Sequence, residues 1–342
     1  MSTDSLTESV HSHEVSLEDL PPKIIEKIFT YFLMNPSDWG NIILTCKRWQ
    51  IIGSKVFDPG YDDNYPIRRA CAQGYYDVVL RFLQDHRVDP SANDDEAIKE
   101  ASRNGHLEVV KILMKDPRVD PAADENLPLR WAASSGHLPV VMELLKHSSV
   151  DPSANGCQAF VWACENGRID VVRYFLQLGD PRINPAANNN AALKHASCNG
   201  HAEVAKELLL LPEVDPAVGN NYPIRYACVH GHVGVVRELL NHPKTDPSAK
   251  NNYALRWACQ GGYLEIVKLL LKDPRVNAAC LDNMCLKIAI NKGYKHIVHE
   301  ILSSINFEAI RIAVENGYED VANTVLEREL FVSLQRKSKR NE

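Results

Sequence analysis

The 342-residue sequence lacks the features that mark several common classes of protein. Its formal net charge of −6 shows no general excess of basic residues, which proteins that bind nucleic acid need to contact the phosphate backbone. No apolar run is long enough for a membrane span, and the polar, acidic stretch 1–16 has no apolar centre typical of a secretory signal. We therefore expect a cytosolic or nuclear protein that binds neither nucleic acid nor a membrane.

Motifs for catalysis and metal binding are also missing. The sequence has no glycine-rich phosphate loop, no His-Glu-x-x-His pair and no nucleophile elbow. No two of the 9 cysteines have the paired spacing typical of a zinc site. We therefore expect no catalytic residues, no cofactor and no metal, and we predict that the chain is not an enzyme.

A glycine recurs along most of the chain at a nearly constant interval. Its positions are Gly74, Gly105, Gly136, Gly167, Gly200, Gly231, Gly262, Gly293 and Gly317. The interval is the same throughout, except that it is two positions longer before Gly200 and seven positions shorter before Gly317. A fixed period of roughly 30 residues is typical of a solenoid, in which no unit can bury its apolar face alone.

Each repeated unit has three parts. The first resembles Arg118–Asn126, whose alternating pattern predicts a hairpin-like turn with Asn or Asp at its tip. The second is a short helix that ends at the glycine, and the third is a longer helix with apolar residues four, five, eight and nine positions after it. The tip positions are Asn64, Asp95, Asn126, Asn190, Asn221, Asn252 and Asn283, with Cys157 as the exception.

Several cysteines share one column of these units. Cys71, Cys164, Cys228 and Cys259 each follow an alanine, and Ala or Ser occupies the column elsewhere. Interchange with such small residues indicates a small buried slot, in which a thiol packs as a small hydrophobe. We predict a structural role for these cysteines.

The units resemble ankyrin repeats. The match is closest at Gly105–Lys111, which reads GHLEVVK, and it covers residues 61–328 as nine units, the last a shortened cap. The period is slightly short, and Tyr222-Pro223-Ile224-Arg225 replaces the usual Thr-Pro-Leu-His. The resemblance implies an all-α solenoid of helix-turn-helix units whose concave face binds a target protein.

A different segment precedes the array. Residues 1–15 are polar and predict a disordered tail, whereas residues 16–57 predict three short helices. This module resembles an F-box, on the basis of Leu20-Pro21, of Ile25 with Ile28-Phe29, and of the run from Cys46 to Trp49, although Gly40 departs from the pattern. The alternative is that these helices only cap the first repeat.

The F-box resemblance implies docking on a Skp-family adaptor of a cullin–RING ubiquitin ligase. The residues it assigns to adaptor binding are Leu20, Pro21, Ile24, Ile25, Ile28, Phe29, Cys46 and Trp49. The chain would then be the substrate-recognition subunit of an SCF-type ligase. The alternative is an ankyrin scaffold, or an effector that sequesters its partner.

Two columns of the short helices are candidates for recognition. One is basic: Arg68, Lys99, Arg130, Lys194, Arg225, Arg256, Lys287 and Arg311, with Val161 as the exception. It predicts either structural hydrogen bonds to the Asn-rich turn or a stripe that binds an acidic or phosphorylated peptide. The next column holds Trp131, Trp162, His195, Tyr226 and Trp257, and it predicts either a binding hot spot or packing between units.

Variable positions further along the short helix complete the predicted target-binding groove. We assign Arg103, Glu165, Asn166 and Gln260 to it, because the ankyrin family exposes these columns. Residues 329–342 form a basic C-terminal tail, which is either a nuclear address or a solvated charged terminus. We expect a chain that is monomeric on its own and that binds a target which the sequence does not identify.

Overall fold

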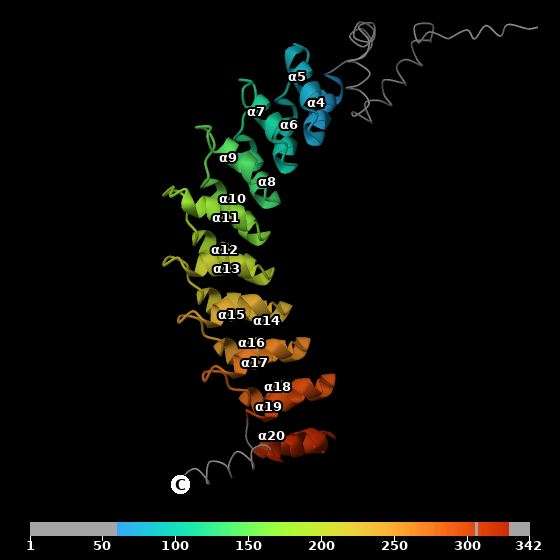
Figure 1. The fold of residues 1–342 in the computed structure, drawn as a ribbon, viewed down its shortest axis with the longest axis vertical. Helices are drawn as coiled ribbons and strands as arrows, with labels where there is room; N and C mark the ends of the chain where they lie inside the picture. Colours follow the sequence, from blue (N-terminus) through green and yellow to red (C-terminus); the bar gives the residue numbers. More distant parts are fainter. Residues whose placement is uncertain (1–59, 305–306, 328–342) are drawn as a thin grey trace, which may run out of the picture. The chain divides into compact units, whose positions relative to one another are not determined.

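The computed structural model describes residues 60–304 and 307–327, and these residues form helices connected by turns (Figure 1). No strand occurs in this part of the chain. The predicted tail 1–15, the F-box-like module 16–57 and the basic tail 329–342 lie outside the described residues. Because the described residues form helices without a strand, the all-α class predicted from the repeats is confirmed.

The chain divides into two compact units, residues 1–121 and 122–342. In the first, α4 (Tyr61–Gln73) packs against α6 (Ala92–Arg103), and α5 (Tyr76–Gln84) packs against α7 (Leu107–Leu113). Each helix pair is one repeat, because the glycine at its centre, such as Gly74, ends the first helix with a left-handed conformation.

The second compact unit continues the same arrangement as two rows of helices (Figure 1). The first-helix row consists of α8 (Ala123–Ser135), α10 (Ala154–Glu165), α12 (Ala187–Cys198), α14 (Val218–His230), α16 (Ala249–Gly261) and α18 (Cys280–Lys292). The second-helix row consists of α9 (Leu138–Leu144), α11 (Ile169–Gln177), α13 (Ala202–Leu209), α15 (Val233–Leu240), α17 (Leu264–Leu271) and α19 (Lys295–Leu302). The stack ends with α20 (Phe307–Glu315), which packs on α18 and α19, and a helical stretch at 319–327.

The core lies between the two rows, as the apolar spacing predicted. Residues four, five and eight positions after the repeat glycine are buried in most units, for example Ile266, Val267 and Leu270, because they share one face of the second helix. The residue nine positions after the glycine, such as Leu271, was also predicted for this face but is only half-buried. From the first helix, Ala258 and Cys259 fill the space opposite. All four cysteines of the small column, Cys71, Cys164, Cys228 and Cys259, are buried.

The predicted turn with Asn or Asp at its tip is present, but no strands pair around it in the part of the chain that the structure describes. Three successive residues at the start of each first helix from α4 to α18 have a left-handed backbone instead; in α16 they are Lys250 (φ 53°), Asn251 (φ 57°) and Asn252 (φ 54°). Asn, Asp and Gly accept this conformation at the lowest cost, and they fill most of these positions. The turn therefore needs no paired strand.

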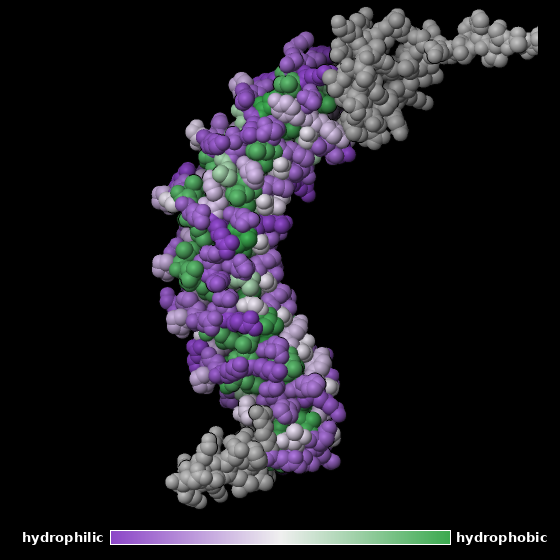
Figure 2. All heavy atoms as spheres, viewed as in Figure 1, coloured by the Kyte–Doolittle hydropathy of each residue, from purple (hydrophilic) through white to green (hydrophobic). Residues whose placement is uncertain are grey.

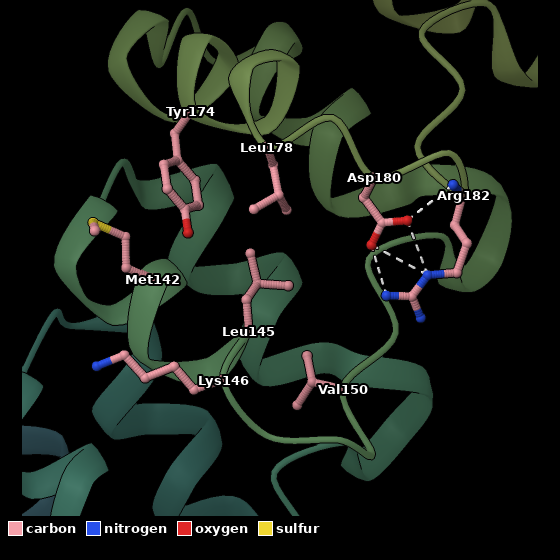
Figure 3. A pocket seen from close by; sticks show the side chains of 8 residues that line it. All are labelled: Met142, Leu145, Lys146, Val150, Tyr174, Leu178, Asp180 and Arg182. Carbon is pink, nitrogen blue, oxygen red and sulfur yellow. Dashed lines mark hydrogen bonds and ion pairs between the residues drawn. The ribbon is translucent and has the colours of Figure 1, made fainter.

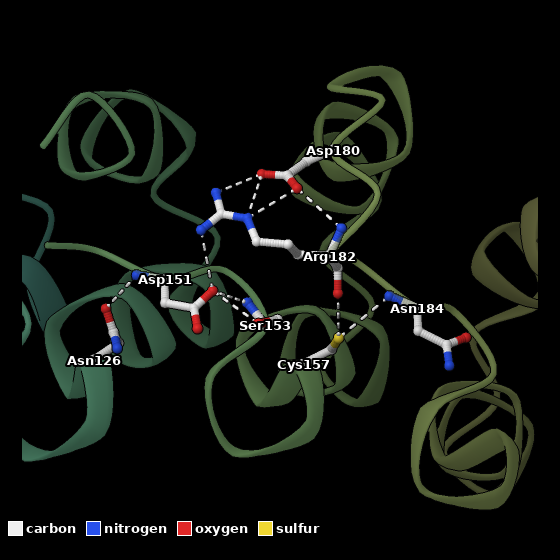
Figure 4. A network of polar contacts seen from close by, with 7 residues as sticks. All are labelled: Asn126, Asp151, Ser153, Cys157, Asp180, Arg182 and Asn184. Carbon is white, nitrogen blue, oxygen red and sulfur yellow. Dashed lines mark hydrogen bonds and ion pairs between the residues drawn. The ribbon is translucent and has the colours of Figure 1, made fainter. Parts of the chain in front are cut away.

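The third residue of this turn joins most units to the next, and from Asp95 onward it is buried. Asn252 Oδ1 accepts a hydrogen bond from the backbone N–H of Asn277 at 2.9 Å, and Asn221 accepts one from Asp246 at 2.6 Å. Asn64, Asp95, Asn126 and Asn190 accept the equivalent bond. Cys157 Sγ replaces the amide oxygen, at 3.2 Å from the Asn184 nitrogen (Figure 4).

The unit of α18 and α19 breaks this series. Among the described residues, the buried Asn283 Oδ1 has no hydrogen-bond partner. The glycine interval that follows is the shortest of the array, so the segment that supplies the N–H in other units is shortened here.

Candidate functional site

The predicted aromatic column falls on successive helices of the first-helix row. Trp131 lies on α8, Trp162 on α10, His195 on α12, Tyr226 on α14 and Trp257 on α16. His195 and Trp257 are exposed, with Trp257 at 39%, and the other three are half-buried. We call the solvent-accessible side chains of this row, with the left-handed turns that open it, the first-row face.

The remaining predicted groove residues lie at different places along their helices. Glu165 and Gln260 lie near the ends of α10 and α16, and Asn166 follows α10 directly. Arg103 ends α6 in the first compact unit. The adaptor residues Leu20, Pro21, Ile24, Ile25, Ile28, Phe29, Cys46 and Trp49 lie outside the described residues, so their role stays a prediction.

The basic column supports the left-handed turns. Arg225 Nε donates to the Asn220 carbonyl at 2.9 Å, and Nη2 donates to the Gly219 carbonyl at 3.1 Å. Arg68 and Arg256 bind the carbonyls of their own turns in the same way. A left-handed turn directs these carbonyls away from the following helix, so an arginine five or six residues later satisfies them. The predicted structural hydrogen bonds are thus confirmed for these arginines.

Aromatic rings surround two of these arginines in the middle of the row. The Arg225 guanidinium lies 5.0 Å from the ring centre of Tyr253 and 5.8 Å from that of Tyr226, within the range of cation–π attraction. Tyr222 and Tyr226 stack with their ring centres 4.0 Å apart. Arg256 lies 5.6 Å from Tyr253. The result is an arginine–tyrosine cluster that spans α14 and α16.

Sequence reasoning missed two members of this cluster. Tyr222 and Tyr253 are half-buried and lie four residues before Tyr226 and Trp257, so each pair shares one face of its helix. Tyr253 and Trp257 have their ring centres 5.8 Å apart. The four-residue spacing of aromatics was the signal that could have identified them.

On α8, α10 and α12, residues of the basic and aromatic columns contribute to packing between units. The Arg130 guanidinium of α8 lies 5.3 Å from the ring centre of Trp162 on α10. His195 Nδ1 lies 3.1 Å from Glu165 Oε2, which joins α12 to α10. Asn166 Nδ2 donates to Ser134 Oγ at 3.1 Å. These contacts support the packing interpretation for Trp162, whereas Trp257 is open to solvent.

Two of the buried cysteines are poorly suited to nucleophilic chemistry. Burial raises the pKa of the Cys71 and Cys228 thiols far above their usual range, so neither forms the reactive thiolate. No group of three or more His, Cys, Asp or Glu side chains in this part of the chain could hold a metal ion. No helix within it is long and apolar enough to cross a bilayer.

A hollow of about 410 Å³ lies on the second-helix row between α9 and α11 (Figure 3). Its floor is apolar, with Met142, Leu145 and Leu178, and Asp180 with Arg182 forms one wall. The Arg182 guanidinium hydrogen-bonds Asp180 and so lowers the pKa of that carboxyl, and it also lies 3.4 Å from Asp151 (Figure 4). This polar network is structural, because it bridges two successive loops at the point where the glycine interval is longest.

Comparison with protein families gives two matches. The model for ankyrin repeats matches residues 129–218 and 193–280. The F-box-like model matches residues 17–56. No curated protein matches the chain.

Proposed function

The chain combines an F-box-like module with ankyrin repeats, and on that premise we propose that it is the substrate-recognition subunit of an SCF-type cullin–RING ubiquitin ligase. Residues 16–57 dock the Skp-family adaptor, and the first-row face holds the target protein. The chain itself does no chemistry, since the ligase's catalytic subunits transfer ubiquitin.

The observation that carries this proposal is the presence of both modules on one chain. Ankyrin repeats and F-box-like modules are both interaction modules, so the two together fit a link between a target and a ligase. The helix rows suit that task, because a stiff scaffold raises the effective concentration of a bound target near the transfer site. The buried cores and the Asn joints between units provide this stiffness.

The alternative is an ankyrin scaffold, or a sequestering effector, whose N-terminal helices only cap the stack. Binding of a purified Skp-family adaptor to the full chain separates the two. The test variant is Leu20→Ala with Pro21→Ala, and the control is Leu6→Ala in the polar tail.

We expect the wild type and the control to bind the adaptor and the double variant to lose binding. The thermal melt of the array should stay unchanged, because stability in repeat arrays depends mainly on neighbouring units. A wild-type chain that does not bind the adaptor would refute the proposal. A double variant whose melt falls would identify the helices as a cap.

A further inference from the structure

The middle of the first-helix row carries only positive formal charge. The segments Ala187–Cys198, Val218–His230 and Ala249–Gly261 contain no Asp or Glu. They do contain Lys194, Arg225, Lys250 and Arg256. In a chain whose net charge is −6, this places a local positive field on the face of α12, α14 and α16.

The arginines of this face differ from those of the loops in what neutralises them. Arg182 and Arg275 each pair with an Asp two residues earlier, at 2.7 Å, and the charges cancel locally. Arg225 and Arg256 instead bind backbone carbonyls, which are neutral dipoles. Neither charge is cancelled by a carboxylate, but Arg225 is buried, so only the half-buried Arg256 can contact an anion outside the molecule directly.

The two lysines of this face also lack a counter-charge. Neither the Lys194 nor the Lys250 ammonium group makes a hydrogen bond or ion pair with any residue that the structure describes. Lys250 is exposed, and it lies in the turn whose carbonyl binds Arg256. The two lysines and Arg256 are therefore the accessible positive groups of this stripe, and the buried Arg225 adds its charge from α14 between them.

Aromatic side chains lie directly beside this stripe. Tyr222, Tyr226 and Tyr253 are half-buried with their rings packed on the arginines, and Trp257 is 39% exposed. Partly exposed aromatics that are held in place by neighbours are efficient anchors, because they lose little conformational freedom on binding. The face therefore offers an apolar contact together with positive charge.

We propose that the first-row face of α12, α14 and α16 binds a peptide segment rich in Asp and Glu with one large apolar side chain. The carboxylates face Lys194, Lys250 and Arg256, and the apolar side chain contacts Trp257. This inference rests on the proposed function, since it gives the chemistry of the target. A peptide fits better than nucleic acid, because its few carboxylates match a stripe confined to three units of a chain with negative net charge.

The test measures the anisotropy of an end-labelled probe peptide with eight glutamates around a central phenylalanine, titrated with the full chain. The test variant carries Lys194→Glu and Lys250→Glu. The matched control carries Lys206→Glu and Lys272→Glu, which make the same charge change in the same two units at exposed positions in or just after second-row helices. Adaptor binding is measured on every sample.

We expect the test variant to bind the probe about tenfold more weakly, and the control to differ from wild type by less than about twofold, because only the first pair faces the carboxylates. Raised salt should weaken wild-type binding. Equal losses in both variants would overturn the proposal, since general charge would then explain binding. Absent binding, or equal binding of a probe with lysine for glutamate, would also overturn it.

Two further outcomes would assign the face to another ligand. Tighter binding of a single-stranded oligonucleotide would favour nucleic acid, and about tenfold tighter binding of a probe with phosphoserine for glutamate would favour a phosphopeptide. Either result contradicts the carboxylate assignment. If the chain binds the adaptor but not the probe, only this inference is wrong. If it binds the probe but not the adaptor, the proposed role in a ligase is wrong.

Discussion

A single buried carboxamide carries the joint between successive units. Asn252 combines a left-handed backbone, at φ 54°, with a side chain whose oxygen satisfies an N–H of the next unit. Asn suits both requirements, because it tolerates positive φ and is an acceptor without a charge. Neighbouring Asn251 has the same backbone conformation, but its side chain is exposed.

Substitutions at Asn251 and Asn252 separate the energetic cost of the left-handed backbone from the contribution of the side-chain hydrogen bond. We expect Asn251→Ala to lower the free energy of unfolding by about 1 kcal/mol, the cost of a left-handed alanine. Asn252→Ala should cost about 2–3 kcal/mol, since it also leaves a buried N–H without an acceptor. Urea unfolding followed by circular dichroism measures both, and equal losses would contradict the role of the joint.

Asp95 holds the same joint in the first compact unit with a carboxylate. Burial raises the pKa of the Asp95 carboxyl, against the opposing effect of its hydrogen bond from the Asp120 N–H. A raised pKa in the folded state means that ionised Asp95 costs stability at neutral pH, and that protonation removes this cost as the pH falls.

We therefore expect Asp95→Asn to raise the free energy of unfolding at pH 7, since the amide keeps the acceptor and loses the buried charge. The gain should shrink on acidification and disappear below about pH 4, near the pKa of an unfolded Asp. Unfolding curves at pH 7 and pH 3.5 test this. A variant that is less stable at pH 7, or whose gain does not depend on pH, would contradict the argument.

At the scale of the element, the residue after the repeat glycine joins several second helices to the first helix of the preceding unit. His232 Nε2 lies 2.8 Å from the Cys198 carbonyl, and His201 Nε2 lies 2.9 Å from that of Glu165. The ring passes over the glycine of the preceding unit, which leaves no space there for a side chain. The glycine is required both for its left-handed backbone and for this close approach.

A comparison of two glycines separates the need for a left-handed backbone from the need for space beside the ring. At Gly200, with φ 84°, an added Cβ would lie 2.5 Å from His232 Nδ1, whereas at Gly293, with φ 73°, it would meet nothing within 4 Å. We expect Gly293→Ala to lower the free energy of unfolding by about 1 kcal/mol and Gly200→Ala by about 3 kcal/mol. Thermal and urea melts provide the comparison, and similar losses would show that the ring moves freely.

At the scale of the whole molecule, stability and recognition use neighbouring positions of the same row. Trp162 packs under Arg130 and joins two units, whereas Trp257 is exposed beside the arginine–tyrosine cluster. The same column can therefore stabilise the stack at one unit and remain open for a partner at another. Figure 2 shows one face of the described chain, on which hydrophilic residues cover much of the surface and apolar residues lie among them.

We predict that Trp162→Ala lowers the melting temperature by several degrees, because it removes a partly buried aromatic from a joint between units. Trp257→Ala should leave the melt nearly unchanged and weaken target capture by about 2 kcal/mol, the size of a binding hot spot. Calorimetry and capture of the acidic probe peptide, measured on both variants, check this. The reverse pattern would place recognition at Trp162.

The sequence by itself determined the repeat, the helix pairs and the core, because these depend on local spacing. A glycine at a nearly constant interval, with apolar residues four, five and eight positions later, is enough to predict two helices and a buried face. The column of Cys71 and Cys228 was likewise assigned correctly to the interior, since only small residues occur there.

Only the tertiary structure decided how the turns and the first-row face are built. The pattern around Asn252 also fits a hairpin, and it is the N–H of Asn277, 25 residues away, that makes the left-handed turn with a buried carboxamide favourable. The cluster of Arg225 with Tyr253 likewise joins different helices, so no local pattern predicts it. Contacts between units depend on how the units stack, and stacking is a property of the packed rows rather than of any one segment.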